Sequence, residues 1–450
     1  MKRRIVLFLA VFMCLSVSAV FGGSRQEAKK AVPSAREYLQ DYVKQHGKSK
    51  YAGTEITLMH FWSDAENFFT QFAKDYSEIM GVKVNVELQP SAGYLPILNT
   101  RVQTGTVPEV FTIWPGDSIM PYLGANVLLD LTDIPFDCKK TMAGYARASC
   151  TFDGRMPIMP VNNAFVGIAY NKDIFKRHNL TPPKDLADLE RIMNVLKTDR
   201  NITYPMIWGT DTDSLLLYMW QISVLYDKYP DFDQRMAANT ISYNNPENQY
   251  IYKKMYIDWP AAKYYNYDNF SAVERMSGGA IQFTDGNAAM MVAGSWDINS
   301  LGMLNEKNIP IGMFPVPGVN HRGNVESAAG EAFAISAVAT GNKKAAAIEL
   351  LNILMSPNIN GKICGIINSL SPYSDVLFDN VPDMITEIST YVNEKARGWN
   401  VAPTASIMKR GEAVNIIRAA DADKQKVLNE HLDYMDKLWK ESLSAAPVVR

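Results

Sequence analysis

Strand-like and helix-like segments alternate between residues 55 and 114, and this order constrains the fold more than any other feature of the sequence. Residues 56–61 form an apolar run, and residues 82–88 alternate apolar and polar side chains. Both patterns are typical of strands. We expect helices between them and at 94–104, followed by a third strand at 109–114. The resulting β-α-β-α-β order predicts right-handed connections and a largely parallel sheet.

The helix between the first two strands carries a signal at each end. Ser63 and Glu66 have the spacing of a capping box, in which each side chain bonds to the backbone of the other residue. Apolar residues recur at helical spacing up to Met80, and Gly81 is expected to stop the helix.

A second set of strands and helices begins near residue 165. We expect strands at 166–170, 204–208, 309–314 and 332–338, and helices at 185–196, 213–226, 343–355, 383–395, 405–419 and 423–442. A chain of 450 residues could hold two large units or three domains of about 150 residues each. The pattern therefore predicts the α/β class.

The first 23 residues have the layout of a secretory signal peptide. Three basic residues are followed by the apolar run 5–15 and then by small residues. An uncleaved anchor is the alternative, because the apolar stretch 5–21 approaches the length of a spanning helix. A lipid anchor is disfavoured, because Cys14 lies inside the apolar run after two bulky residues. Residues 24–53 read as a polar lead-in with one short helix.

Composition and motifs exclude several classes of function. The chain has 45 basic and 47 acidic residues, so no basic excess is available for nucleic acid. The five histidines have no metal-ligand spacing, and no phosphate loop, dinucleotide fingerprint or nucleophile elbow occurs. We therefore expect no cofactor, no metal and no enzymatic activity.

Three cysteines remain after the signal segment: Cys138, Cys150 and Cys364. Their odd number leaves at least one thiol unpaired. A Cys138–Cys150 disulfide would stabilise the fold by about 3 kcal/mol. Three buried thiols that pack as small apolar side chains are equally compatible with the sequence.

Six segments, in this order, carry a resemblance to one family: EITLMHFWSDAENFFTQFAKDYSEIMGVKVNVELQP, VQTGTVPEVFTIWPGD, LLDLTDI, AFVGIAYNKDIFKRHNLTPPKDLADL, FTDGNAAMMVAGSW and AFAISAVATGNKKAAAIELLNILMSP. They resemble the family 1 extracellular solute-binding proteins of ATP-driven importers, the maltose-binding-protein-like group. The resemblance covers roughly residues 54–442, and Glu109 departs from it where the family has aspartate.

The resemblance implies two discontinuous α/β lobes with a solute held between them at a hinge. Lobe one would comprise residues 54–163 plus 333–372, and lobe two residues 164–332 plus 373–445. The protein would be an exported monomer, periplasmic or extracellular. It would deliver a mono- or oligosaccharide to the membrane permease subunits of an ABC importer.

Candidate solute contacts follow from the chemistry of sugars, which present an apolar ring face and a rim of hydroxyls. Aromatic rings suit the face, and carboxylates and amides suit the rim. The resemblance implies contact positions at Trp114, Asp117, Asn162 or Asn163, and Trp296, and less directly at Glu331 and Trp399. The residue types add three further candidates: Trp62, Asp64 and Trp208. For each tryptophan the alternative is core packing, and Asp64 could simply favour a helix amino end. The ten tyrosines within 218–267 could line a groove or pack helices.

Trp296 follows Gly294 and Ser295, which predict a turn and a helix start capped by Ser295. A side chain at such a junction is expected to face the solute.

Two other functions remain open on the sequence alone. A secreted glycan-acting enzyme would also carry tryptophans and paired carboxylates. A solute sensor or adhesin could use the same fold. An importer operon beside the gene would favour uptake, and a neighbouring sensor kinase without an importer would favour sensing.

Overall fold

The computed structural model describes residues 32–163, 165–209, 216–217, 219–269, 272–325, 329–379, 383–391 and 413–445. The signal peptide, Trp399 and most of the helix expected at 405–419 lie outside these ranges. No helix of the described residues has the length and apolar character needed to cross a membrane.

Lobe one is built on a five-stranded sheet with the order β2-β1-β3-β9-β4. Its strands are β1 Glu55–His60, β2 Lys83–Leu88, β3 Val110–Ile113, β4 Ile158–Pro160 and β9 Ala332–Ile335. Its helices and helical turns are α1 Ala35–His46, η1 Ser63–Ala65, α2 Glu66–Met80, α3 Ser91–Thr104, η2 Gly116–Ile119, α4 Met120–Gly124, η3 Asp137–Lys140, α5 Gly144–Ser149, α15 Gly341–Leu354 and α16 Pro357–Ile366.

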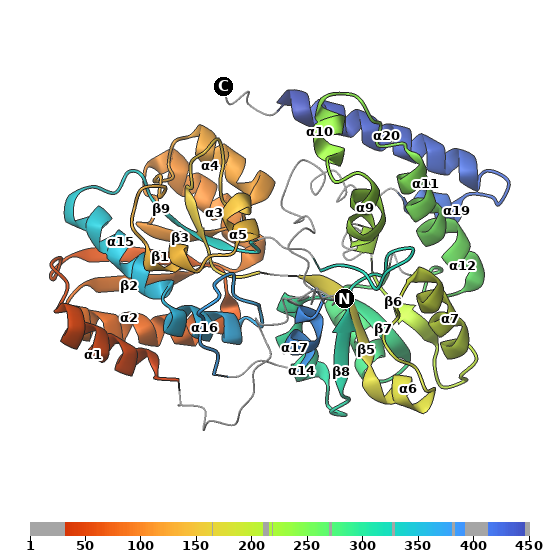
Figure 1. The fold of residues 1–450 in the computed structure, drawn as a ribbon, viewed down its shortest axis with the longest axis horizontal. Coiled ribbons are helices and arrows are strands. Elements are labelled where there is room, and N and C mark those ends of the chain that lie inside the picture. Colours follow the sequence, from red (N-terminus) through yellow and green to blue (C-terminus); the bar gives the residue numbers. More distant parts are fainter. Residues whose placement is uncertain are drawn as a thin grey trace, which may run out of the picture.

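Lobe two is built on a four-stranded sheet with the order β6-β7-β5-β8, and it lies beside lobe one (Figure 1). Its strands are β5 Val166–Asn171, β6 Tyr204–Ile207, β7 Ala288–Gly294 and β8 Ile311–Phe314. Its helices and helical turns are α6 Lys172–Arg177, α7 Leu186–Leu196, η4 Gln221–Leu225, α9 Tyr226–Lys228, α10 Phe232–Ala237, α11 Pro246–Lys253, η5 Lys254–Asp258, α12 Trp259–Ala262, η7 Arg275–Gly279, α13 Ala280–Thr284, η8 Ser295–Asp297, α14 Ile298–Leu304, α17 Asp383–Ser389, α19 Val414–Arg418 and α20 Lys424–Ala445.

The two-lobed α/β fold is confirmed, but the expectation of largely parallel sheets is correct only in part. Strand β1 pairs in parallel with β2 and β3, as the β-α-β-α-β order predicts. Strand β9 runs antiparallel to β3 and β4, and β5 runs antiparallel to β7 and β8. Strands β5 and β9 enter from the other lobe, so no helical crossover over their own sheet fixes their direction.

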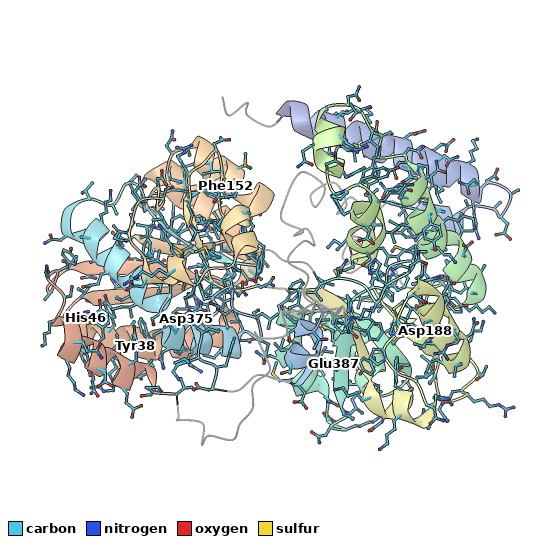
Figure 2. The ribbon with its side chains drawn as sticks, viewed as in Figure 1. Tyr38, His46, Phe152, Asp188, Asp375 and Glu387 are labelled. Atoms are coloured by element: carbon cyan, nitrogen blue, oxygen red, sulfur yellow. The ribbon has the colours of Figure 1, made fainter. Side chains whose placement is uncertain are left out.

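Lobe one includes two segments beyond its expected ranges. Helix α1 packs on α2 and α16, and Leu39 of this helix is fully buried in the core of lobe one. After α16, Pro372 O accepts a bond from Ala143 N–H, and the Leu377 N–H donates to Pro357 O. Figure 2 accordingly shows Asp375 in lobe one and Glu387 in lobe two.

Helix α2 starts differently from what its sequence pattern predicts. Residues 63–65 form the turn η1, and α2 begins at Glu66 with no side-chain capping bond from Ala65 or from the preceding Trp62. The expected capping box does not form, because the extra turn places Ser63 one turn before the helix. The expected stop at Gly81 is confirmed, and its φ of 83° lies in the left-handed region that glycine favours.

Burial decides two questions that the sequence left open. Cys138, Cys150 and Cys364 are free and buried, so they pack as apolar side chains. Burial raises the pKa of the Cys138 thiol to about 12, which keeps it protonated. Within the Tyr-rich stretch, most described tyrosines belong to the core of lobe two: Tyr226, Tyr243, Tyr252, Tyr256, Tyr264 and Tyr265.

Candidate functional site

Two chain crossings between the lobes and the segment that follows α16 meet at Asn162. The Val161 N–H donates to Glu331 O at 2.8 Å, and the Gly330 N–H donates to Asn162 O at 3.0 Å, so the two crossings are paired. The Asn162 side chain accepts from the Glu331 N–H at 2.8 Å and donates to Ser369 Oγ, in the segment that follows α16, at 3.0 Å. The same Nδ2 also donates to the Glu331 carboxylate. Asn162 therefore ties the crossings together, with its side-chain amide already engaged.

Glu331 places a carboxyl group at this junction. Burial raises the pKa of Glu331 to about 7, while the Asn162 amide and the nearby Trp62 indole N–H act in the opposite direction. Such a carboxyl is partly protonated near neutral pH, so it can both accept and donate hydrogen bonds.

Asn163 has unsatisfied hydrogen-bonding capacity at the hinge. Its side chain is 0% exposed, and neither Nδ2 nor Oδ1 has a hydrogen-bond partner among the described residues. Buried polar atoms normally have partners, because leaving one unpaired costs about 1–3 kcal/mol. Water or a bound solute could supply the missing bonds.

Trp114 and Phe61 form an aromatic platform at the carboxyl ends of β3 and β1. The two rings are stacked 4.0 Å apart at 7°, and Tyr94 lies edge-on to both. The Tyr94 hydroxyl donates to Thr112 O at 2.6 Å, which holds the Tyr94 ring against β3. Trp114 is half-buried whereas Phe61 is buried. The platform therefore presents a supported tryptophan at the strand ends, where ligands bind in open α/β sheets.

Asp64 connects the lobes in this structure. It is exposed on η1 and accepts a 2.8 Å bond from Asn299 Nδ2 of α14, in the other lobe. Asn299 Nδ2 also donates to Ile366 O at 3.0 Å, and Asn368 Nδ2 donates to Asn299 Oδ1. Asp64 is thus part of an interlobe contact. Asn299 and Asn368 carried no recognisable signal in the sequence.

Trp296 lies half-buried in η8, at the start of the same helical segment. Trp296 precedes Asn299 by three residues, and its ring packs in part on the core of lobe two. The expected Ser295 cap is wrong. The Ser295 hydroxyl accepts from the Phe165 N–H and does not cap the helix. Asp297 caps the turn instead, by accepting from the Gly294 N–H at 2.7 Å.

The structure places the other candidates in different environments. Trp208 is 1% exposed and stacked 3.5 Å from Tyr265, so it belongs to the core rather than to a solute-binding surface. Trp62 is 7% exposed and packs on Phe69 and Phe333 beside the hinge. Asp117 lies in η2, directly after the Trp114 platform.

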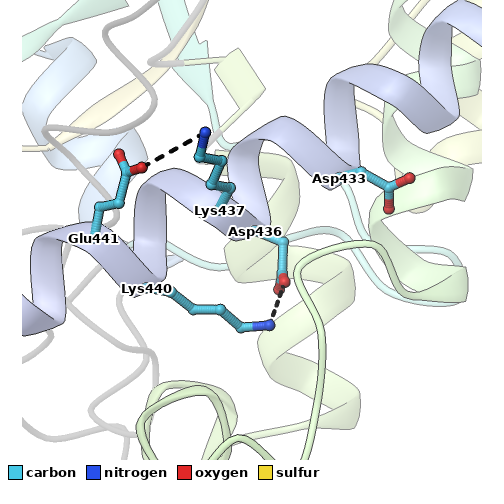
Figure 3. Close-up of a pocket in the computed structure, with 5 residues that line it drawn as sticks. All are labelled: Asp433, Asp436, Lys437, Lys440 and Glu441. Atoms are coloured by element: carbon cyan, nitrogen blue, oxygen red, sulfur yellow. Dashed lines mark ion pairs between the residues drawn. The ribbon is translucent and has the colours of Figure 1, made fainter.

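Some surface pockets lie away from this junction. The one on α20, with a volume of about 390 Å³, is lined by a single helix face: Asp433, Asp436, Lys437, Lys440 and Glu441 (Figure 3). Lys440 pairs with Asp436 at 2.7 Å and Lys437 with Glu441 at 3.8 Å. These acids and bases largely neutralise each other, as is usual on an exposed helix.

Two α/β lobes joined by hydrogen-bonded crossings define the class of two-lobed binding proteins. Residues 68–384 match the family described as bacterial extracellular solute-binding protein, and the chain belongs to this family. An uncharacterised ABC transporter extracellular-binding protein of Pyrococcus horikoshii is 22% identical over 332 residues, covering 70% of each chain.

Solved structures share the fold. RafE of Streptococcus pneumoniae without ligand has a TM-score of 0.69 at 20% identity, covering 85% of this chain and 98% of that one. The sugar-binding protein MalE of Xanthomonas citri has a TM-score of 0.68 at 14% identity, covering 87% and 99%. The fold and the family together define the chain as an extracellular solute-binding protein.

Proposed function

We propose that this protein binds a mono- or oligosaccharide between its lobes and delivers it to the permease subunits of an ABC importer. The observation that carries the proposal is the Trp114 platform, a half-buried indole held flat against Phe61 at the strand ends. A rigid aromatic face suits the apolar face of a sugar ring. A RafE structure that shares the fold holds raffinose, which supports the same class of solute.

In this proposal the remaining contacts come from the hinge and from lobe two. Trp296 would cover a second sugar face, and Asn163, Glu331 and Asp117 would bond to hydroxyl groups. Asn162 would hold the crossings while the lobes close. The protein would act as an exported monomer after removal of its signal peptide.

We also propose that the protein turns over no glycoside. The family supplies binding components of transporters, and a glycosidase would need an acid and a second carboxylate facing each other across the bond. Incubation with oligosaccharides should release no reducing ends. Release that disappears in Glu331→Gln would show that the protein is an enzyme.

A thermal-shift screen against a saccharide library tests the binding proposal. A ligand at a hundred times its dissociation constant stabilises the folded protein by about 2.7 kcal/mol. For a saccharide that binds, Trp114→Ala should weaken affinity roughly ten- to a hundred-fold, because a stacked ring contributes about 1–3 kcal/mol. Trp114→Phe should retain most of the affinity.

Tyr434→Ala is the matched control, since Tyr434 is an exposed aromatic residue on α20. Wild-type affinity in Trp114→Ala would remove Trp114 from the site. A screen in which amino acids or peptides stabilise the protein and no saccharide does would overturn the substrate class.

A further inference from the structure

The Trp296 indole lies directly over the backbone of Gly294. A Cβ atom on Gly294 would lie 2.3 Å from Cε2 and 2.4 Å from Cζ2 of this indole. The backbone of Gly294 has φ −94° and ψ 164°, a conformation that any residue adopts. The ring, and not the chain, therefore requires glycine at this position.

A buried ion pair stands beside the same ring. Asp297 is 3% exposed, and the Oδ2 atom that accepts from the Gly294 N–H also pairs with Arg275 Nη1. The Arg275 side chain is 16% exposed, and its guanidinium carbon lies 6.0 Å from the centre of the Trp296 ring. One carboxylate thus fixes both the turn that carries the ring and the cation beside it.

We propose that Arg275 is a positioning residue, which together with Asp297 and Gly294 fixes the plane of the Trp296 indole. A planar guanidinium can pair with a carboxylate and approach an aromatic face at the same time, whereas an ammonium is a point charge. Fixing the ring before the solute arrives reduces the ordering cost of binding. Only this effect on affinity rests on the proposed function.

The position of the ring can be measured without any ligand. In protein labelled with 5-fluorotryptophan, the fluorine resonance of Trp296 is identified by its loss in Trp296→Phe. Arg275→Lys and Gly294→Ala should each shift or split this resonance. Arg322→Lys is the matched control, because the Arg322 guanidinium lies 4.5 Å from the Tyr391 ring, elsewhere in lobe two.

A double variant tests the proposal without leaving an unpaired buried charge that could unfold the protein. Removing Arg275 alone would leave the Asp297 charge buried without its cation. Arg275→Met combined with Asp297→Asn removes both charges and keeps an oxygen that can accept from the Gly294 N–H. An unmoved Trp296 resonance in this variant, in Arg275→Lys and in Gly294→Ala would overturn the proposal.

Raffinose binding separates this inference from the proposed function. Arg275→Lys should weaken raffinose affinity about tenfold, as misplacing a preorganised contact does, and should add no loss in a Trp296→Ala background. If the resonance moves while Trp296→Ala binds raffinose like wild type, Arg275 still positions the ring, and Trp296 is not a solute contact.

Discussion

Glu331 lies in an environment that changes the ordinary chemistry of its carboxyl group. Its carboxyl is buried at the junction of the two paired crossings, where the described residues place the Asn162 amide and the Trp62 indole near it. Amide and indole N–H groups stabilise a carboxylate less than an ion pair does. The raised pKa of Glu331, about 7, follows from this balance.

The folding stability of the protein should therefore depend on Glu331 above pH 5. Because its folded pKa is raised from 4.5 to about 7, the stability it contributes is complete below pH 4.5 and is lost as pH rises through 7. Glu331→Gln should be more stable than wild type by about 3 kcal/mol at pH 8 and equal to it near pH 4.5.

Urea unfolding of both proteins at several pH values measures this difference. Comparing the two proteins cancels the opposite trend of His60 and His431, whose pKa values burial lowers to about 4 and which therefore destabilise the fold as pH falls below 6.5. A difference in stability that does not change with pH would show that Glu331 does not titrate in this range.

Among the elements of lobe one, helix α2 ends on a left-handed backbone conformation that glycine adopts more readily than other residues. Helix α2 ends at Gly81, whose φ is 83° and whose added Cβ would lie 3.0 Å from the Ala52 Cβ. Gly93 lies inside α3, and a Cβ there would meet nothing within 4 Å. These two glycines of one lobe are therefore under opposite constraints.

Substitution by alanine should have opposite effects at the two positions. Gly81→Ala should destabilise lobe one by about 1–2 kcal/mol, because a left-handed backbone is costly for alanine. Gly93→Ala should stabilise it by about 0.5–1 kcal/mol through better helix propensity. Thermal unfolding of both variants beside wild type measures the effects. If both substitutions changed the stability in the same direction, Gly81 would not be the residue that ends α2.

At the scale of the molecule, the lobes are linked by the crossings and by the bond between Asp64 and Asn299. The crossings are continuous chain, so they set the hinge. The Asn299 amide reaches Asp64 and Ile366 O in lobe one from the first turn of α14. This contact can form and break without unfolding either core, so it can bias the angle between the lobes.

Removing the contact should let the lobes separate further. Asn299→Ala and Asp64→Ala should each give a larger mean radius of gyration in solution scattering without saccharide, with little change in melting temperature. Asn299→Ala should have the larger effect, because it also removes the bonds to Ile366 O and Asn368. Asp64→Ala should add nothing in an Asn299→Ala background, because its bond to Asn299 is already lost there. Ser300→Ala on the same helix is the control. A radius unchanged in all variants would show that the contact does not restrain the lobes.

Local patterns were enough to predict the strands and helices of the β-α-β-α-β unit, the helix stop at Gly81 and the family, because period, glycine chemistry and motif order are local properties. Tertiary structure alone decided the antiparallel directions of β5 and β9, since these strands enter from the opposite lobe. It also placed Trp208 in the core, engaged Asn162 in the crossings and paired Asp64 with Asn299. Each of these depends on a contact between residues far apart in the chain, which no local pattern encodes.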